Sequence, residues 1–136
     1  VHLETGRVEY IQAPLQIHRS RGQSDRFIWN EDKVANDTLN ARGIDVGAAD
    51  ARSKKSGWGH VSAATPIAIN DKVYFSSMTG LTYVIQADAE NLDPDAILAI
   101  NDLGPAGQTW SIAQLAPVGN RIYAHTLKGV VCIGAE

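Results

Sequence analysis

The chain is poor in the residues from which metal and nucleophilic sites are usually built. Cys132 is its only cysteine, so neither an internal disulfide nor a thiolate pair for a metal can form. The four histidines, at positions 2, 18, 60 and 125, are never two or four residues apart, so no zinc motif follows from them. A GxSxG elbow, a glycine-rich phosphate loop and an HExxH sequence are also missing, which argues against a self-contained hydrolase.

Strong charge and long apolar runs are missing as well. The formal net charge is only −3 in 136 residues, which gives no reason to expect nucleic-acid binding. No apolar run approaches the roughly 18 residues that a membrane-spanning helix needs. The chain does have 44% hydrophobic and 20% charged residues. These ordinary values predict a folded globular protein rather than a disordered one.

A repeat with a period of 49 residues runs through the C-terminal half of the chain. The stretch 62–85 falls without gaps on the stretch 111–134. Identical residues meet at four positions: Ser62/Ser111, Ala64/Ala113, Tyr74/Tyr123 and Gly80/Gly129. Each copy has an apolar stretch, a two-residue polar turn, an alternating strand, a glycine turn and a further β-branched strand. The polar turns, Asn70-Asp71 and Gly119-Asn120, suit positive φ angles, which Asn and Gly accept at low cost.

This pattern predicts short strands in both copies, and the first copy carries a fourth strand that the second lacks. The predicted strands are 62–69, 72–77, 81–87 and 97–101 in the first copy, and 111–118, 121–126 and 130–134 in the second. A period of 40–50 residues with about four short strands favours a propeller over a sandwich, although periodicity alone leaves the sandwich open.

We therefore predict an all-β fold, a partial β-propeller of about two four-stranded antiparallel blades plus the end of a preceding blade. The predicted division is 1–10 for the end of a preceding blade, 11–57 for an insertion or rim loop, 58–104 for a blade and 105–136 for an incomplete last blade. Because the chain begins at Val1 inside a strand-like phrase, we expect it to come from a longer precursor.

Several phrases resemble the pyrroloquinoline-quinone-like (PQQ-like) propeller repeat family. They are Glu4-Thr5-Gly6-Arg7-Val8, Ala64-Thr65-Pro66-Ile67, Asn70-Asp71-Lys72-Val73-Tyr74-Phe75 and Gly80-Leu81-Thr82-Tyr83-Val84-Ile85. The resemblance covers residues 1–10 and 58–136, and residues 127–134 look like the last blade of such proteins. It implies a ring of about seven or eight blades, usually exported to the periplasm or the cell surface of bacteria.

The resemblance leaves the chemistry open, because some members are quinone- and calcium-dependent dehydrogenases and others are scaffolds without quinone. The dehydrogenases resemble one another in a vicinal cysteine pair beside the cofactor, which a chain with only Cys132 cannot carry. Tyr10 also replaces the Trp that ends the usual repeat motif. We expect a non-catalytic binding or scaffold segment without a cofactor. The alternatives are a fragment of a dehydrogenase that uses PQQ and calcium, with most catalytic residues elsewhere, or an accessory to a hydrolase or lyase domain.

Five residues are candidates for ligand binding, and none is predicted to be catalytic: Trp29, Trp58, His60, Trp110 and His125. Trp58, His60 and Trp110 precede the first strand of each blade, where loops open on one rim of a propeller. Indole and imidazole groups there can stack on a ligand or hydrogen-bond to it. The simpler interpretation is that the Trp rings fill the gap between blades.

Residues 11–57 match neither blade. They predict an insertion over one rim, with a strand at 26–29 and a short helix from Asn30 to Arg42 closed by Gly43. Such a segment can contact a ligand or a partner. Four carboxylates flank the fourth strand, namely Asp88, Asp93, Asp95 and Asp102. They favour a solvated turn over a calcium loop, with Asp95 able to cap a short turn.

The predicted partners follow from what two blades leave uncovered. Two blades expose apolar faces and strand edges, so we expect them to associate with the remaining blades or with another copy of the chain. A protein or small molecule at the rim is a further possible partner.

Overall fold

The computed structural model describes residues 4–30, 33–34, 39–46, 64–104 and 109–134. Within these residues the chain is all-β, with three antiparallel sheets and no α-helix. The first sheet pairs β1 (Gln16–His18) with β2 (Arg26–Ile28). The four-stranded sheet runs in the order β3 (Ile67–Ile69), β4 (Lys72–Ser76), β5 (Leu81–Gln86) and β6 (Ile97–Asp102). The three-stranded sheet is β7 (Ala116–Val118), β8 (Arg121–Thr126) and β9 (Gly129–Gly134).

The strands lie where the repeat predicts them, except that the first strand of each copy is shorter. β3 begins at Ile67 and β7 at Ala116, rather than at residues 62 and 111. Pro66 precedes β3 and has no N–H to give to a sheet. In the second copy the N–H of Ser111 donates to the carbonyl of Met78, 3.1 Å away, so this part of the chain is tied to another turn. The predicted fourth strand is present as β6.

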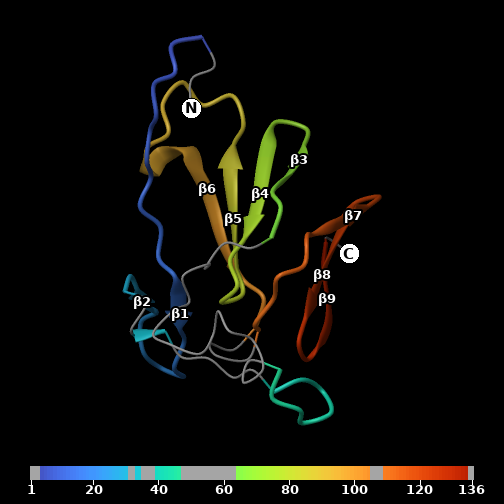
Figure 1. Cartoon of the computed structure of the whole chain (residues 1–136). Coiled ribbons are helices and arrows are strands. Elements are labelled where there is room, and N and C mark those ends of the chain that lie inside the picture. Colours follow the sequence, from blue (N-terminus) through green and yellow to red (C-terminus); the bar gives the residue numbers. More distant parts are fainter. Residues whose placement is uncertain (1–3, 31–32, 35–38, 47–63, 105–108, 135–136) are drawn as a thin grey trace.

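The four-stranded sheet lies between the other two parts of the molecule (Figure 1). One of its faces packs on the three-stranded sheet through four buried residues, Ile67, Leu103, Leu115 and Ala124. The other face packs on the N-terminal segment through Ile17, Leu81 and Tyr83. Half-buried side chains from both sheets pack on the first cluster, whereas those of the second come from the four-stranded sheet and from Ala13. Successive layers therefore stack face to face, an arrangement consistent with a partial propeller.

Equivalent residues of the two copies point in the same direction along this stack. Phe75 of β4 faces the N-terminal segment, and its repeat partner Ala124 of β8 faces the four-stranded sheet, which precedes it in the chain. Tyr74 points the other way, toward the three-stranded sheet. Tyr123, its repeat partner, points away from the four-stranded sheet because it alternates with Ala124.

The gapless alignment of the copies is wrong by one residue beyond the glycine turn. Ser76 pairs with Thr82, whereas its partner His125 pairs with Val130. Five residues separate the first pair and four the second. Tyr83 of β5 therefore corresponds to Val131 of β9, and not to Cys132. Both face the preceding layer, because a one-residue slip exchanges the two faces of a strand.

The polar turns of the repeat confirm the turn prediction. Asn70 has φ of 55° and its partner Gly119 has φ of 59°. These lie in the left-handed region, which Asn and Gly tolerate better than other residues. The same backbone turn thus recurs at the 49-residue spacing.

Residues 4–14 contain no strand, and residues 1–3 lie outside the described part. The assignment of residues 1–10 to the end of a preceding blade stays a prediction. Ile17 is only 3% exposed and belongs to the core. This part of the 11–57 segment therefore covers a face of the four-stranded sheet.

The predicted helix of residues 30–42 is wrong where the structure describes it. Leu39 forms an isolated bridge with Asp45, and a turn lies between them. The side chain of Asn40 accepts hydrogen bonds from the N–H groups of Arg42 (2.9 Å) and Ile44 (3.0 Å). An Asn side chain that bonds its own backbone in this way competes with a helix. The predicted strand at 26–29 is confirmed as β2.

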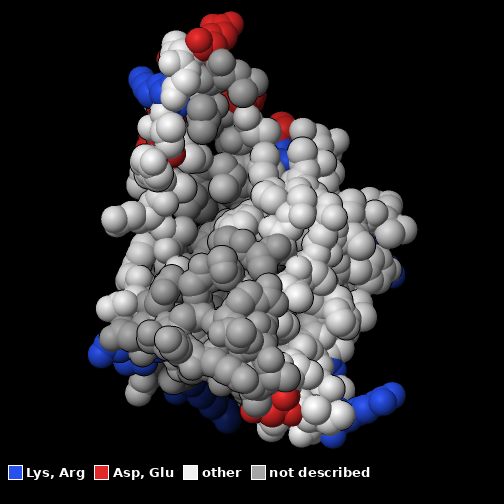
Figure 2. All heavy atoms as spheres, viewed as in Figure 1, with Lys and Arg blue, Asp and Glu red and all other residues white. Residues whose placement is uncertain are grey.

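On the face seen in Figure 2, charged groups gather toward the two ends, and the described surface between them is mostly uncharged. No helix in the described ranges is long and apolar enough to cross a membrane.

Candidate functional site

A short strap, residues 109–111, connects the glycine turns of the two copies. The N–H of Ser111 donates to Met78 in the β4–β5 turn, and the N–H of Leu127 in the β8–β9 turn donates to the carbonyl of Trp110, 3.0 Å away. The hydroxyl of Ser111 donates to the carbonyl of His125, at 2.5 Å. Backbone groups that would otherwise be buried without partners are satisfied across the two sheets in this way.

Thr109 begins the strap and fits against two glycines. Its hydroxyl donates to the carbonyl of Thr79, 3.3 Å away. A Cβ atom on Gly80 would lie 2.0 Å from Oγ1 of Thr109, and one on Gly104 would lie 2.7 Å from its Cγ2. Gly80 also has φ of +89°. Only glycine therefore lets the β4–β5 turn approach the strap this closely.

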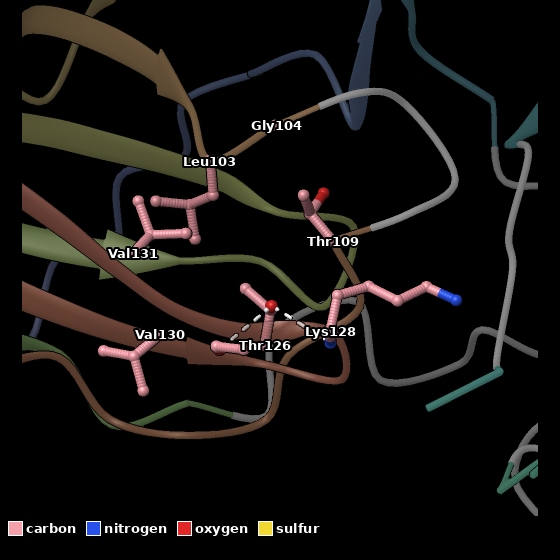
Figure 3. A pocket seen from close by; sticks show the side chains of 8 residues that line it. Leu103, Gly104, Thr109, Thr126, Lys128, Val130 and Val131 are labelled. Atoms are coloured by element: carbon pink, nitrogen blue, oxygen red, sulfur yellow. Dashed lines mark hydrogen bonds between the residues drawn. The ribbon is translucent and has the colours of Figure 1, made fainter. Parts of the chain in front are cut away.

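A pocket of about 280 Å³ opens beside this strap, between the end of β6 and the start of β9 (Figure 3). It is lined by Leu103, Gly104, Thr109, Thr126, Lys128, Gly129, Val130 and Val131. In Figure 3 Leu103 and Val131 lie close together on one side, and the Lys128 side chain extends away from them. The pocket thus has an aliphatic wall and a cationic group on its rim.

The hydroxyls of the pocket hold its turns together. Oγ1 of Thr126 donates to the carbonyl of Gly129 (3.2 Å) and accepts from the N–H of Lys128 (3.3 Å). The hydroxyl of Thr109 is used by Thr79, as above. Neither hydroxyl has a neighbouring base among the pocket residues, so the pocket lacks the pair that nucleophilic catalysis needs. What it can do is hold a small apolar group that carries a negative charge near Lys128.

Three of the five predicted site residues lie in the described part of the chain, in three different places. Trp110 lies in the strap and is 7% exposed, in agreement with a ring that fills a gap between sheets. His125 lies exposed on β8, outside the pocket lining. Trp29 follows β2 and is 58% exposed. Trp58 and His60 lie outside the described residues.

Sequence reasoning missed the pocket residues. Thr109 and Lys128 each stand one position from a residue that the sequence pointed to: Trp110 as a candidate ligand-binding residue and Gly129 as a repeat position. Their turns are visible in the sequence, but nothing in it indicates that the β6 end and the β8–β9 turn lie side by side.

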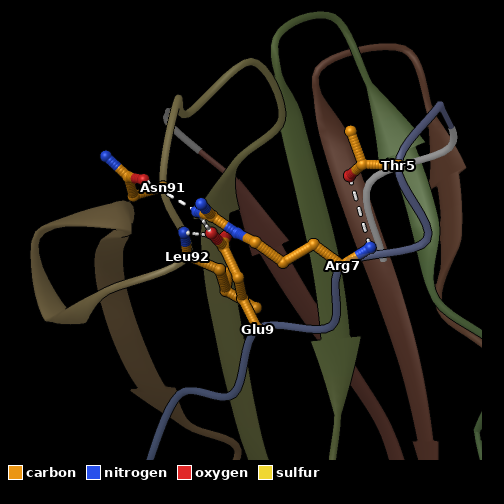
Figure 4. Close-up of polar contacts among 5 residues, drawn as sticks. All are labelled: Thr5, Arg7, Glu9, Asn91 and Leu92. Atoms are coloured by element: carbon orange, nitrogen blue, oxygen red, sulfur yellow. Dashed lines mark hydrogen bonds and ion pairs between the residues drawn. The ribbon is translucent and has the colours of Figure 1, made fainter.

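A second polar cluster ties the N-terminal segment to the β5–β6 loop (Figure 4). Glu9 accepts a hydrogen bond from the N–H of Leu92 at 2.9 Å and forms an ion pair with Arg7. Arg7 also donates to the side chain of Asn91, 3.3 Å away. The hydrogen bond from Arg7, followed by that from Leu92, lowers the pKa of Glu9. The cluster is largely exposed, so we read it as an attachment point.

Burial is the largest cause of the pKa shift at Tyr83 and at Asp102. Burial raises the pKa of Tyr83 to about 12, and its hydroxyl donates to the carbonyl of Pro14. Burial also raises the pKa of Asp102, opposed by the N–H of Gly104, which donates to its carboxylate at 3.2 Å. Tyr83 is thus held neutral as a bond between layers.

The carboxylates around β6 form a turn. Asp93, rather than the predicted Asp95, caps the short 3-10 helix η2 (Pro94–Ala96) by accepting from the N–H of Asp95 at 3.0 Å. Across the described ranges no three acidic, histidine or cysteine side chains gather in a way that could hold a metal ion.

Comparison with protein-family models, with curated proteins and with solved structures found no match to this chain.

Proposed function

We propose that the chain is a non-catalytic binding or scaffold segment of a β-propeller, made of two successive blades. One observation supports this proposal above the others. The two sheets stack with equivalent residues facing the same way, as Phe75 and Ala124 do. Units that stack by a repeated interface serve to build an extended surface, and they carry binding groups on the turns. The pocket beside the strap lies on such turns.

The chemistry of the pocket agrees with binding rather than turnover. Its two threonine hydroxyls are engaged in turn hydrogen bonds, and its one charged group is the ammonium of Lys128. A cation beside aliphatic side chains can recognise a carboxylate attached to an apolar group.

Two further parts of the proposal rest on the sequence resemblance alone. They are membership of the PQQ-like repeat family and a location in the periplasm or outside the cell. The parent protein on this proposal is a ring whose other blades contact these two.

Titration with quinone tests the non-catalytic part of the proposal. PQQ would be added to the full-length protein with excess Ca²⁺, the absorbance spectrum recorded, and dye-linked oxidation of short alcohols and aldoses measured. We expect no saturable spectral change and no oxidation above a control that contains an unrelated protein. A change that saturates at one quinone per protein, with oxidation of a substrate, would replace the proposal by a quinoprotein dehydrogenase.

A further inference from the structure

We propose that one end of the molecule docks on the surface of an anionic lipid bilayer, through the hairpin of β1 and β2 together with the loop 39–46. We call this the basic end and define it by its four exposed arginines, Arg19, Arg21, Arg26 and Arg42. The proposal does not depend on the proposed function, because it concerns neither the residues that line the pocket nor the cluster between the two sheets.

Hydrogen bonds place the hairpin and the loop at the same end of the sheets. The hydroxyl of Thr79, in the β4–β5 turn, donates to the carbonyl of Leu15, which precedes β1. The strap joins this turn to the β8–β9 turn, where the carbonyl of Leu127 accepts from the N–H of Ala41 at 3.1 Å. Both parts of the basic end therefore lie beside the glycine turns, at the lower end of the molecule in Figure 1.

The opposite end of the sheets is acidic. Asp71 precedes β4 and so lies at the far end of that strand from the glycine turn. The N–H of Ala87 donates to the carbonyl of Asp71 at 2.8 Å, which places the β5–β6 loop at that far end. Four acidic residues belong to this loop: Asp88, Glu90, Asp93 and Asp95. In Figure 2 basic groups line the lower end of the molecule. Such a separation of charge directs the basic end toward a negative surface.

The arginines of the hairpin are available to phosphate groups. Arg19 is paired with Asp25, whose carboxylate lies 3.3 Å from its Nε. Within the described residues Arg21 and Arg26 have no ion-pair partner. A guanidinium group donates two parallel hydrogen bonds to a phosphate, and it keeps its charge at any physiological pH. The phosphate of a lipid headgroup is a ligand of this chemistry.

Exposed apolar side chains accompany the arginines in both parts of the basic end. In the hairpin, Phe27 is 46% exposed and Trp29, which follows β2, is 58% exposed. In the loop, Leu39 and Ile44 flank Arg42 and are 41% and 57% exposed. Indole rings favour the headgroup level of a bilayer, and aliphatic groups favour the acyl chains below it. A nucleic acid offers bases for stacking but no hydrocarbon for Leu39 and Ile44, so the bilayer is the better fit.

The two kinds of side chain support one mode of binding. The arginines bind headgroup phosphates, while the aromatic and aliphatic side chains enter the boundary between headgroups and acyl chains. The strength of such binding grows with the apolar area that is buried and with the number of basic groups near the surface. The acidic loop between β5 and β6 then points away from the membrane. This arrangement needs no segment that crosses the bilayer.

Co-sedimentation with vesicles tests the electrostatic part of the proposal. The full chain is mixed with phosphatidylcholine vesicles that contain or lack phosphatidylglycerol, and the amount that sediments without vesicles is subtracted. We expect binding at least about 10-fold tighter with phosphatidylglycerol, and weaker as salt rises. The double variant Arg21→Gln with Arg26→Gln should bind about 10-fold more weakly.

The control for charge is the double variant Lys72→Gln with Arg121→Gln. It makes the same change in net charge, but both residues lie at the end of the sheets away from the glycine turns. Binding by this variant should stay within about 2-fold of the original, because charges more than a Debye length from the surface are screened. Equal losses in the two double variants would overturn the proposal, since net charge and not a defined surface would then govern binding.

The apolar part of the proposal has its own variant. Phe27→Ser with Trp29→Ser should weaken binding to the phosphatidylglycerol vesicles about 10-fold. Val8→Ser with Tyr10→Ser is the matched control, because these side chains are 48% and 87% exposed on the N-terminal segment that is held at the β5–β6 loop. The control should bind within about 2-fold of the original. Urea unfolding checks that every variant is folded.

Three further results would each overturn the proposal. The first is no binding, or equal binding to vesicles with and without phosphatidylglycerol. The second is unchanged binding after the loss of Phe27 and Trp29. The third is tighter binding to duplex DNA than to the vesicles at the same concentration of negative charge, which would make the basic end a nucleic-acid surface.

Discussion

At the residue scale, the close contact between Gly80 and Thr109 determines which residue the β4–β5 turn can hold beside the strap. The two sheets are joined where the β4–β5 turn meets the segment that leads into β7, and the glycine is required both by its positive φ and by its closeness to Thr109. A Cβ atom on Gly129 would meet nothing within 4 Å, and Gly129 has no positive φ. The gapless alignment places Gly129 on Gly80, but the strand pairing makes it the counterpart of Leu81, so the two glycines do not share a structural role.

We predict that Gly80→Ala destabilises the protein by about 2 kcal/mol or more, because the new methyl group meets Thr109 and the backbone is strained. Gly129→Ala is the matched control and should cost less than about 1 kcal/mol. Urea unfolding followed by tryptophan fluorescence measures both. The double variant with Thr109→Gly should recover part of the loss. Equal effects at the two glycines would contradict the account of the strap.

Tyr83 predicts a dependence of stability on alkaline pH. Its pKa is raised to about 12 in the folded protein, from about 10 in the unfolded chain. The neutral form is favoured by folding, so its contribution is fully present below pH 10 and is lost as the pH rises from about 10 to about 12. The loss amounts to at most about 2–3 kcal/mol.

Unfolding measured between pH 9 and 12 tests this prediction. Tyr83→Phe should be less stable at neutral pH by about 1 kcal/mol, because the hydrogen bond to Pro14 is lost. The variant should also show a flatter pH dependence above pH 10. A steep loss that persists in the variant would assign the alkaline transition to other groups.

At the scale of the elements, the four-stranded and three-stranded sheets should unfold as one cooperative unit, because they share a buried cluster. Ile67 of β3 and Leu115, which precedes β7, are both buried in that cluster. Ile17 belongs to the other cluster, on the opposite face of the four-stranded sheet. Substitutions in one cluster should therefore interact with each other and be independent of the other cluster.

We predict that Ile67→Ala and Leu115→Ala each cost about 2–4 kcal/mol. Their double variant should depart from additivity by about 0.5 kcal/mol or more. The control cycle pairs Ile67→Ala with Ile17→Ala and should be additive within about 0.5 kcal/mol. If the variants prove too unstable, valine replaces alanine at both isoleucines. Additivity in both cycles would show that the sheets do not share a core.

At the scale of the whole molecule, the outer face of the three-stranded sheet is an uncovered apolar surface of the described part of the chain. We define this outer face by Val118, Tyr123, Val130 and Cys132. Val118 is 63% exposed and Val130 66% exposed, and Cys132 is also exposed. The equivalent face of the four-stranded sheet, which includes Ile69 and Tyr74, is covered by the next sheet. A face of this kind promotes association.

We predict that the chain self-associates reversibly at concentrations of tens of micromolar, and that ammonium sulfate strengthens the association. The double variant with Val118→Glu and Val130→Glu should raise the dissociation constant about 10-fold or more. Leu98→Glu is the matched control, because Leu98 is 46% exposed on β6, away from the outer face. Sedimentation velocity measures the association. A folded monomer throughout this range would contradict the prediction.

The sequence alone determined the strands of the two copies and their order, because alternation, turn residues and the 49-residue spacing are local properties. It also determined that Asn70 and Gly119 take the same turn conformation. The sequence alone did not determine the register after the glycine turn. A gapless alignment makes Cys132 the counterpart of Tyr83, whereas the strand pairing makes Val131 its counterpart. Hydrogen bonds across the turn, and the need to bury Val131 rather than Cys132 against Leu103 and Leu115, decided that slip.

Only the tertiary structure decided what surrounds the candidate site. The strap, the pocket and the tie between Glu9 and Leu92 join residues that are far apart in the chain, and no local pattern specifies such contacts. The helix predicted at 30–42 is wrong at Leu39 for a related reason. The bridge to Asp45 and the side chain of Asn40 provide hydrogen-bond partners to the backbone that a helix would not use. Local residue preferences determine which segment forms a strand. The need to pair backbone groups and to bury apolar faces determines where that strand lies in the fold.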